Sequence, residues 1–280
     1  MKVALTGVTG FIGHHMVEAL ARLGLSPTLV VRPTSVVPSR LRHHQVVRMD
    51  LLAPPPNAFD LLGRPDLLIH LAWGGLPNYQ SLHHFERELP AQYSLLKTML
   101  HDGLPRLLVT GTCFEYGEQS GPLSEDMNTR PTNPYGFAKD MLRQQLQYLQ
   151  RELPFALTWA RLFYLHGEGQ APTALLPQLR RAVAAGETHF PMSGGEQLRD
   201  YLDVTEAASH LAQLALGQRG HGLVNLCSGR PISVRRLVEG WIKTNRWSIR
   251  PDLDRYPDPT HEPLAFWGDA TKLNHCLQSL

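Results

Sequence analysis

The chain has 280 residues, a formal net charge of +2, 42% hydrophobic residues and 19% charged residues. This composition is that of a globular protein with a substantial core, and it excludes a disordered chain. The near-neutral charge gives no reason to expect nucleic acid or a membrane as partner. No apolar run is as long as a membrane span, and no signal-peptide pattern is present, so we expect a cytoplasmic protein.

Cysteine and histidine usage gives no sign of a disulfide scaffold or of a metal centre. The three cysteines, Cys113, Cys227 and Cys276, form no CxxC pair, which indicates reduced thiols. The 14 histidines are scattered or adjacent in pairs, a spacing that fits no common ligand set. We therefore expect no metal site.

Short apolar runs alternate with amphipathic stretches along the first half of the chain. They predict strands at 3–5, 28–31, 46–47, 67–71, 107–110 and 155–160. They also predict helices at 11–23, 81–100 and 134–149, the second interrupted near Pro90. Strands that alternate with helices indicate βαβ crossovers, so we predict an α/β fold with a doubly wound parallel sheet of the Rossmann type.

The composition of the sequence changes after residue 163, where glycine and proline become frequent. Short strands and helices follow, including the segments 205–216 and 233–244, and the Pro- and Asp-rich tail at 251–263 is predicted to be loop. We place the large domain at 1–163 and a small C-terminal lobe mainly at 164–280, with some later segments returning to the sheet.

A glycine-rich segment, TGVTGFIG at 6–13, directly follows the first strand and opens the first helix. Its glycines permit a tight turn, a close approach to a pyrophosphate and close packing of helix on strand. The start of the helix then presents free N–H groups to the phosphates. The spacing is GxxGxxG, and its place between strand and helix predicts a dinucleotide site. The expected contacts are Gly7, Thr9, Gly10, Phe11, Ile12 and Gly13.

The end of the second strand carries information about which dinucleotide binds. Asp or Glu at this point usually holds the ribose 2′-hydroxyl of NAD, whereas Arg suits the 2′-phosphate of NADP. Here Arg32 follows the strand and no carboxylate is present, so we predict a preference for NADP(H), with NAD(H) possible. Asp50 could accept a hydrogen bond from the adenine. The remaining expected cofactor contacts are Leu51, Leu71, Ala72 and Trp73.

Tyr135 and Lys139 lie four residues apart at the start of a predicted helix, so the phenol and the ammonium share one helix face. A neighbouring cation favours phenolate, and we expect it to depress the pKa of Tyr135. Such a phenol can exchange a proton at a carbinol or ketone. Thr112 ends the fifth strand, at the edge of the sheet that faces the ligand, where its hydroxyl can bond a substrate oxygen.

These motifs resemble those of the extended short-chain dehydrogenases/reductases, in particular the nucleotide-sugar epimerases, dehydratases and reductases. The resemblance covers essentially the whole chain and rests on TGVTGFIG at 6–13, HLAW at 70–73, TGTCFEYG at 110–117, NPYGFAK at 133–139, RLFYLHGEGQ at 161–170 and LRDYLDV at 198–204. It implies catalytic roles for Thr112, Tyr135 and Lys139, the lysine also binding the nicotinamide ribose. It further implies that Arg199 reaches a nucleotide diphosphate and that helices 81–100 and 134–149 form a homodimer.

The chain departs from the family pattern at the substrate side. Dehydratases of this family carry an Asp-Glu pair after the triad threonine, and here Cys113 and Phe114 stand there. Tyr164 replaces the usual asparagine of the lobe, and the chain is short for an epimerase. The segment 73–79 resembles the loop of 4-keto-6-deoxy sugar reductases. The expected substrate contacts are Trp73, Cys113, Tyr164 and Arg199.

These observations favour NADPH-dependent reduction of the 4-keto group of a nucleoside-diphosphate 4-keto-6-deoxyhexose. One alternative is a nucleotide-sugar epimerase with tightly bound NAD, and another is a dinucleotide-sensing protein without turnover. Glu115 is interpreted as a carboxylate bonded to backbone. For His166, substrate contact and a structural role both remain open.

Overall fold

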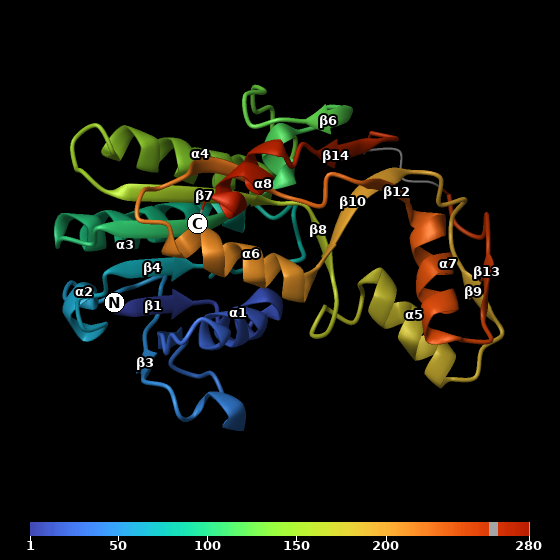
Figure 1. Cartoon of the computed structure of the whole chain (residues 1–280), viewed down its shortest axis with the longest axis horizontal. Coiled ribbons are helices and arrows are strands. Elements are labelled where there is room, and N and C mark those ends of the chain that lie inside the picture. The colour runs from blue at the N-terminus through green and yellow to red at the C-terminus, as the bar shows by residue number, and fades with distance from the viewer. Residues whose placement is uncertain (258–262, 280) are drawn as a thin grey trace.

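The central element of the computed structural model, which describes residues 1–257 and 263–279, is a seven-stranded sheet (Figure 1). All its strand pairs are parallel, and the order is β11-β7-β5-β4-β1-β2-β3. The strands are β1 (Val3–Thr6), β2 (Thr28–Val31), β3 (Val46–Arg48), β4 (Leu67–His70), β5 (Arg106–Thr112), β7 (Ala156–Leu162) and β11 (Gly222–Leu226). The order reverses between β1 and β4, which opens a crevice at their carboxyl ends. The predicted α/β doubly wound fold is confirmed.

Helices cover both faces of this sheet, and each face has its own hydrophobic core. On one face pack α1 (Phe11–Arg22), α6 (Val204–Leu216) and α8 (Thr271–Gln278). On the other face pack α2 (Ala58–Leu61), α3 (Leu89–His101) and α4 (Pro134–Leu149). Adjacent strand residues point to opposite cores, as Leu5 and Ala4 do. This explains why the strands read as continuous apolar runs.

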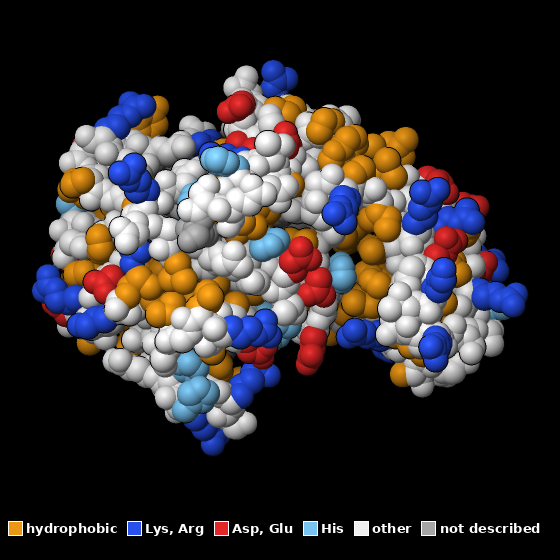
Figure 2. Space-filling model, viewed as in Figure 1, with side chains coloured by type: hydrophobic (Ala, Val, Ile, Leu, Met, Phe, Trp, Pro, Cys, Tyr) orange, Lys and Arg blue, Asp and Glu red, His pale blue; other side chains and the backbone are white. Residues whose placement is uncertain are grey.

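The lobe lies beside the carboxyl edge of the sheet, at the right of Figure 1. It contains β8 (Tyr164–His166), α5 (Leu175–Ala184), β9 (His189–Pro191), β10 (Leu198–Asp203), β12 (Pro231–Ser233), α7 (Val234–Asn245) and β13 (Arg250–Asp252). Its core joins α5 and α7 through side chains such as Leu179 and Val238. Two short strands, β6 (Gly121–Leu123) and β14 (Phe266–Gly268), pair beside it. In Figure 2, acidic and basic side chains are intermixed over the lobe.

Two segments differ from their predicted structure. The helix expected at 81–100 begins as a π-helical turn, η2 (His84–Glu88), and becomes regular only in α3. Pro90 stands in the first turn of α3, where its missing N–H breaks no hydrogen bond. The tail predicted as loop at 251–263 contains part of β13, which pairs with β9, a distant partner that local sequence cannot reveal. Residues 258–262 of that tail lie outside the described residues.

Short 3₁₀ turns complete the described elements, namely η1 (Ser39–Leu41) and η3 (Cys113–Tyr116). None of the helices within 1–257 and 263–279 combines the length and the apolar character that crossing a lipid bilayer requires.

A substitution at Gly13 tests how tightly the glycine loop after β1 packs against α1. A Cβ on this helical glycine would lie 2.1 Å from the Gly7 carbonyl oxygen, so Gly13→Ala forces the loop and helix apart. We expect a loss of about 1–3 kcal/mol in the free energy of unfolding, measured by urea denaturation. Gly240→Ala is the matched control, because Gly240 lies in α7 with open space around its Cβ position. That variant should gain about 0.5–1 kcal/mol. Equal stability of the two variants would contradict the packing argument.

Candidate active site

The glycine loop forms a close-fitting backbone cradle at the crevice between β1 and β4. Gly7 has φ +75°, and a Cβ there would lie 2.8 Å from the backbone nitrogen of Ala72. Helix α1 starts after Gly10, with no side chain capping its first N–H groups. Free N–H groups at a helix start attract anions. The cradle therefore fits the pyrophosphate of a dinucleotide.

A cavity of about 530 Å³ extends from this cradle along the ends of β2 and β3. Nine of the expected cofactor contacts line it, namely Gly7, Thr9, Gly10, Arg32, Asp50, Leu51, Leu71, Ala72 and Trp73. Phe11 lines the neighbouring cavity, whereas Ile12 packs on the core and Gly13 is buried under the loop. We call this space the cofactor cavity.

Three polar residues of the cofactor cavity escaped the sequence analysis. Glu88 is buried, and its Oε1 lies 3.2 Å from Nε2 of His83 while its Oε2 accepts a hydrogen bond of 2.9 Å from Gln92. Glu88 and Gln92 come from η2 and α3, and His83 directly precedes η2, across the crevice from the glycine loop. The four-residue spacing of Glu88 and Gln92 was the available signal, because it places both on one helix face.

The three expected catalytic residues come together where β5 meets α4. Asn133 accepts a hydrogen bond of 2.8 Å from the Gly136 N–H and so caps α4, and Pro134 occupies its first turn. This start places Tyr135 on the sheet side, where it is buried and hydrogen-bonded to the Thr112 side chain. One turn later, the ammonium of Lys139 donates to the Thr110 carbonyl at 2.9 Å.

Lys139 is fully enclosed yet has partners for its charge. Its Nζ lies 4.0 Å from the centre of the Trp73 ring, close enough for a cation–π interaction. Burial lowers the pKa of Lys139 to about 7, and the carboxylates of Glu115 and Glu88 counteract that fall. The lysine therefore titrates close to neutral pH.

The expected depression of the Tyr135 pKa is wrong for the protein alone. Burial raises the pKa of Tyr135 well above its ordinary value, and nearby Tyr79 and Glu115 act in the same direction. The hydrogen bond to Thr112 lowers the pKa, but by less. The ammonium of Lys139 points to Trp73 and Thr110. Tyr135 is thus a protonated phenol, suited to donate a proton.

A second cavity of about 540 Å³ opens beside this centre and reaches into the lobe. Thr112, Cys113, Tyr135 and Tyr164 line it, so two of the four expected substrate contacts lie here. Sequence analysis did not expect contacts from its other aromatic walls, because they converge from separate segments: Tyr79, Phe114, Phe163, Tyr201 and Trp241. His166 also lines this space. We call it the substrate cavity.

Arg199 and Trp73 are not among the residues that line the substrate cavity. Trp73 faces the cofactor cavity instead. Arg199 is buried in β10, where its Nη1 donates to the carbonyls of Leu198 at 2.8 Å and Leu264 at 3.3 Å. Its guanidinium also lies 4.5 Å from the centre of the Phe266 ring.

Glu115 is a structural carboxylate, as interpreted from the sequence. Its Oε1 accepts hydrogen bonds from the Thr112 N–H at 2.9 Å and from the Trp159 indole at 3.0 Å. Its Oε2 accepts from Nε of Arg161 at 2.6 Å, and Glu115 is fully buried. This carboxylate is therefore engaged by protein groups on both oxygens.

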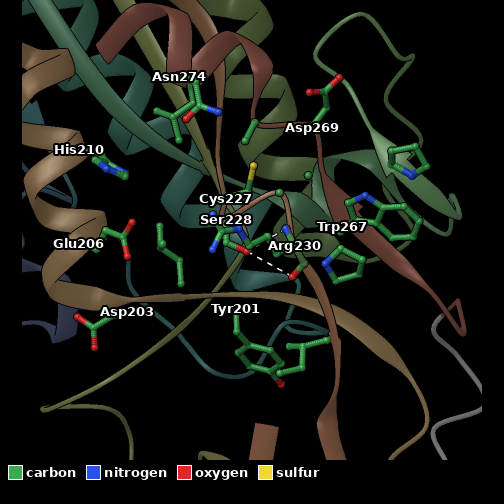
Figure 3. A pocket seen from close by; sticks show the side chains of 18 of the residues that line it. Tyr201, Asp203, Glu206, His210, Cys227, Ser228, Arg230, Trp267, Asp269 and Asn274 are labelled. Atoms are coloured by element: carbon green, nitrogen blue, oxygen red, sulfur yellow. Dashed lines mark hydrogen bonds between the residues drawn. The ribbon is translucent and has the colours of Figure 1, made fainter. Parts of the chain in front are cut away.

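A further hollow of about 950 Å³ lies between α6, α8, β10 and β12 (Figure 3). Its labelled side chains include Asp203, Glu206, Arg230 and Asp269, which carry charges of both signs. They extend from different walls and do not converge on one point. This hollow, although larger, lacks the catalytic groups described above.

Comparison with known proteins places the site in a family context. Residues 3–226 match the family model described as "NAD dependent epimerase/dehydratase family". A dTDP-6-deoxy-L-talose 4-dehydrogenase (NAD(+)) from Aggregatibacter actinomycetemcomitans is 27% identical over 270 residues, covering 96% of this chain and 99% of that protein. UDP-arabinose 4-epimerase 1 from Arabidopsis thaliana is 26% identical over 97% of this chain and 73% of its own length.

Solved structures share the fold over nearly the whole chain. MoeE5 in complex with UDP-glucuronic acid and NAD has a TM-score of 0.83 and 25% identity, covering 99% of this chain and 93% of that one. The UDP-N-acetylglucosamine 4-epimerase from Methanobrevibacter ruminantium M1 has a TM-score of 0.86 and 23% identity, covering 98% and 91%. The chain therefore belongs to the NAD dependent epimerase/dehydratase family of enzymes.

Proposed function

We propose that this enzyme uses NADPH to reduce the 4-keto group of a nucleoside-diphosphate 4-keto-6-deoxyhexose. The observation that carries the proposal is the composition of the substrate cavity. A protonated phenol and a threonine hydroxyl lie at its inner end, and no Asp or Glu stands among its described lining residues. This set can donate a proton to a carbonyl oxygen.

The same composition disfavours elimination of water from the sugar. Dehydration requires an acid and a base at adjacent sugar carbons in addition to the hydride step. Cys113 and Phe114 follow Thr112 into the cavity and supply no such carboxyl pair, since Phe114 has no ionisable group and Cys113 carries a thiol. Glu115, the next residue, is committed to Arg161 and Trp159.

The apolar walls of the substrate cavity favour a deoxysugar. Leu76, Phe114, Phe163 and Leu175 are among its lining residues, beside several tyrosines. A 6-methyl group can be buried against such walls without loss of a hydrogen bond, whereas a 6-hydroxyl buried there would need one of the polar lining side chains as a partner. The relative from Aggregatibacter, by its name, also acts at C4 of a 6-deoxy sugar nucleotide, which supports this choice.

Each of these residues has a distinct role in the proposed reduction. A dinucleotide held by the residues of the cofactor cavity would supply the hydride. Thr112 fixes the carbonyl oxygen, and Tyr135 delivers a proton to that oxygen as negative charge develops on it. Lys139 would hold the nicotinamide ribose. The aromatic walls around the sugar would exclude water, which strengthens these interactions.

Incubation of the enzyme with NADPH and a panel of 4-keto-6-deoxy sugar nucleotides tests the function. We expect stoichiometric oxidation of NADPH with one or more of them. The second candidate, 4-epimerisation, draws support from the UDP-arabinose 4-epimerase relatives. Interconversion of UDP-sugar epimers without net change in added cofactor would favour that candidate and overturn the reductase.

Tyr135→Phe tests the proton donor. Removing the hydroxyl while keeping the ring should lower single-turnover reduction by about 10²–10⁴-fold, because acid catalysis is lost. Affinity for NADPH, measured by fluorescence titration, should stay near that of the wild type. Tyr256→Phe is the control, since Tyr256 is exposed in the lobe. Turnover of Tyr135→Phe within a few-fold of wild type would move the proton donor elsewhere, with His166 the next candidate.

Arg32→Ala tests the choice of cofactor. Arg32 lines the cofactor cavity just after β2, where its guanidinium can pair with a 2′-phosphate. We expect the wild type to bind NADPH more tightly than NADH and the variant to lose about tenfold in NADPH affinity alone. Arg22→Ala, at the exposed end of α1, serves as control. Tighter binding of NADH by the wild type would reject the assignment.

A further inference from the structure

The loop after β4 builds a ring platform beneath the catalytic lysine. The Trp73 indole lies under the Lys139 ammonium, 4.0 Å from Nζ to the ring centre. Its own N–H donates to Nδ1 of His84 at 3.1 Å. His84 is completely buried, and its Nε2 lies 2.8 Å from the Asn78 carbonyl oxygen. One histidine thus joins the indole to the loop that follows it.

The two hydrogen-bond partners of His84 determine which of its ring nitrogens carries the proton. An indole N–H can only donate, so Nδ1 of His84 must accept and carries no proton. A carbonyl can only accept, so Nε2 must carry the proton and donate to Asn78. In an imidazole protonated on both nitrogens, the Nδ1–H would face the indole N–H, and two donors cannot form a hydrogen bond with each other. Both partners therefore require the neutral ring with its proton on Nε2.

The same platform contacts the catalytic phenol. The ring of Tyr135 lies 5.2 Å from that of His84 and 6.1 Å from that of Trp73, both edge to face. The Tyr135 N–H donates to the Tyr79 carbonyl at 3.2 Å, which binds the loop to the start of α4. A Cβ on Gly75 would lie 3.1 Å from Cε1 of His84, so glycine lets the loop pass close to the imidazole.

We propose that His84 is a positioning residue that holds the Trp73 indole flat beneath the Lys139 ammonium and thereby keeps the lysine charged. The catalytic consequence rests on the proposed function, because a charged Lys139 matters only where Tyr135 and the ribose need it. The charge state itself is a property of the protein alone.

Several ionisable groups face Lys139, and their effects have opposite signs. Burial lowers its pKa to about 7, while Glu88 from η2 and Glu115 from η3 raise that pKa. Tyr135 on α4 and His70 on β4 are uncharged neighbours at neutral pH, since burial raises the pKa of the phenol and lowers that of the imidazole. The indole face adds a further attraction for the ammonium. Loss of the platform should therefore lower the lysine pKa.

Fluorescence of the protein without cofactor measures this charge. The emission of Trp73 should change as the ammonium above it loses its proton. The chain has five tryptophans, so subtracting the spectrum of Trp73→Phe isolates this one. In the wild type we expect a transition near the pKa of about 7. Lys139→Met should abolish the transition, which assigns it to the lysine and not to a histidine.

His84→Phe and His84→Gln separate positioning from packing. Phenylalanine fills the space but neither accepts from the indole nor donates to Asn78, whereas glutamine can do both. We expect His84→Phe to move the Trp73 transition down by about half a pH unit or more, or to remove it, and His84→Gln to restore it. His101→Phe, at the exposed end of α3, is the matched control.

The outcomes of these titrations separate a failure of the His84 proposal from a failure of the proposed function. An unchanged transition in His84→Phe would overturn the positioning role, as would a shift that His84→Gln does not rescue. If the His84 variants fail to fold, Trp73→Phe gives the second test. The phenyl ring of that variant lacks the N–H that donates a hydrogen bond to His84 in the wild type. In the pH profile of NADPH affinity, this variant should then lose the wild-type transition that Lys139→Met also removes. Both titrations remain readable if no sugar nucleotide turns over.

Discussion

The buried ion pair between Glu115 and Arg161 is the interaction on which the site's geometry depends. Both side chains are at most 1% exposed, and the pair closes at 2.6 Å between Oε2 and Nε. Two charges so far from water are costly unless every lone pair is used, and removal of one partner typically costs about 3–5 kcal/mol. Here the second oxygen accepts from the Thr112 N–H, so the pair fixes the backbone of Thr112.

The same ion pair also reaches α4, the helix that carries Tyr135 and Lys139. Arg143 of α4 lies 3.9 Å from Glu115 and 2.6 Å from Asp140, a neighbour on its own helix. Arg161 is in turn 3.9 Å from Asp140. One network of charges therefore joins η3, β7 and α4. The placement of Thr112 relative to α4 is thus supported by charged groups that do not line the substrate cavity.

The sequence was sufficient for the features that depend on neighbours along the chain. Alternating strands and helices, the glycine loop and the spacing of Tyr135 and Lys139 are all local patterns, and the structure shows the first two as expected. Features that depend on burial or on distant partners were out of reach. The pKa of Tyr135 follows from enclosure, β13 from its pairing with β9, and the place of Glu88 in the cofactor cavity from segments that meet across the crevice.

The position of α6 and α8 bears on how the chain acquires its structure. Both pack on the same face as α1, and their side chains Ala208, Leu211 and Leu273 belong to the core that contains Met16. Residues near the amino terminus therefore lack part of their apolar cover until the final third of the chain has been made. Proteins usually fold their domains in order of synthesis. In this chain, the N-terminal half would leave the ribosome with one hydrophobic face of its sheet exposed to water. That face is covered only after α6 and α8 have been made.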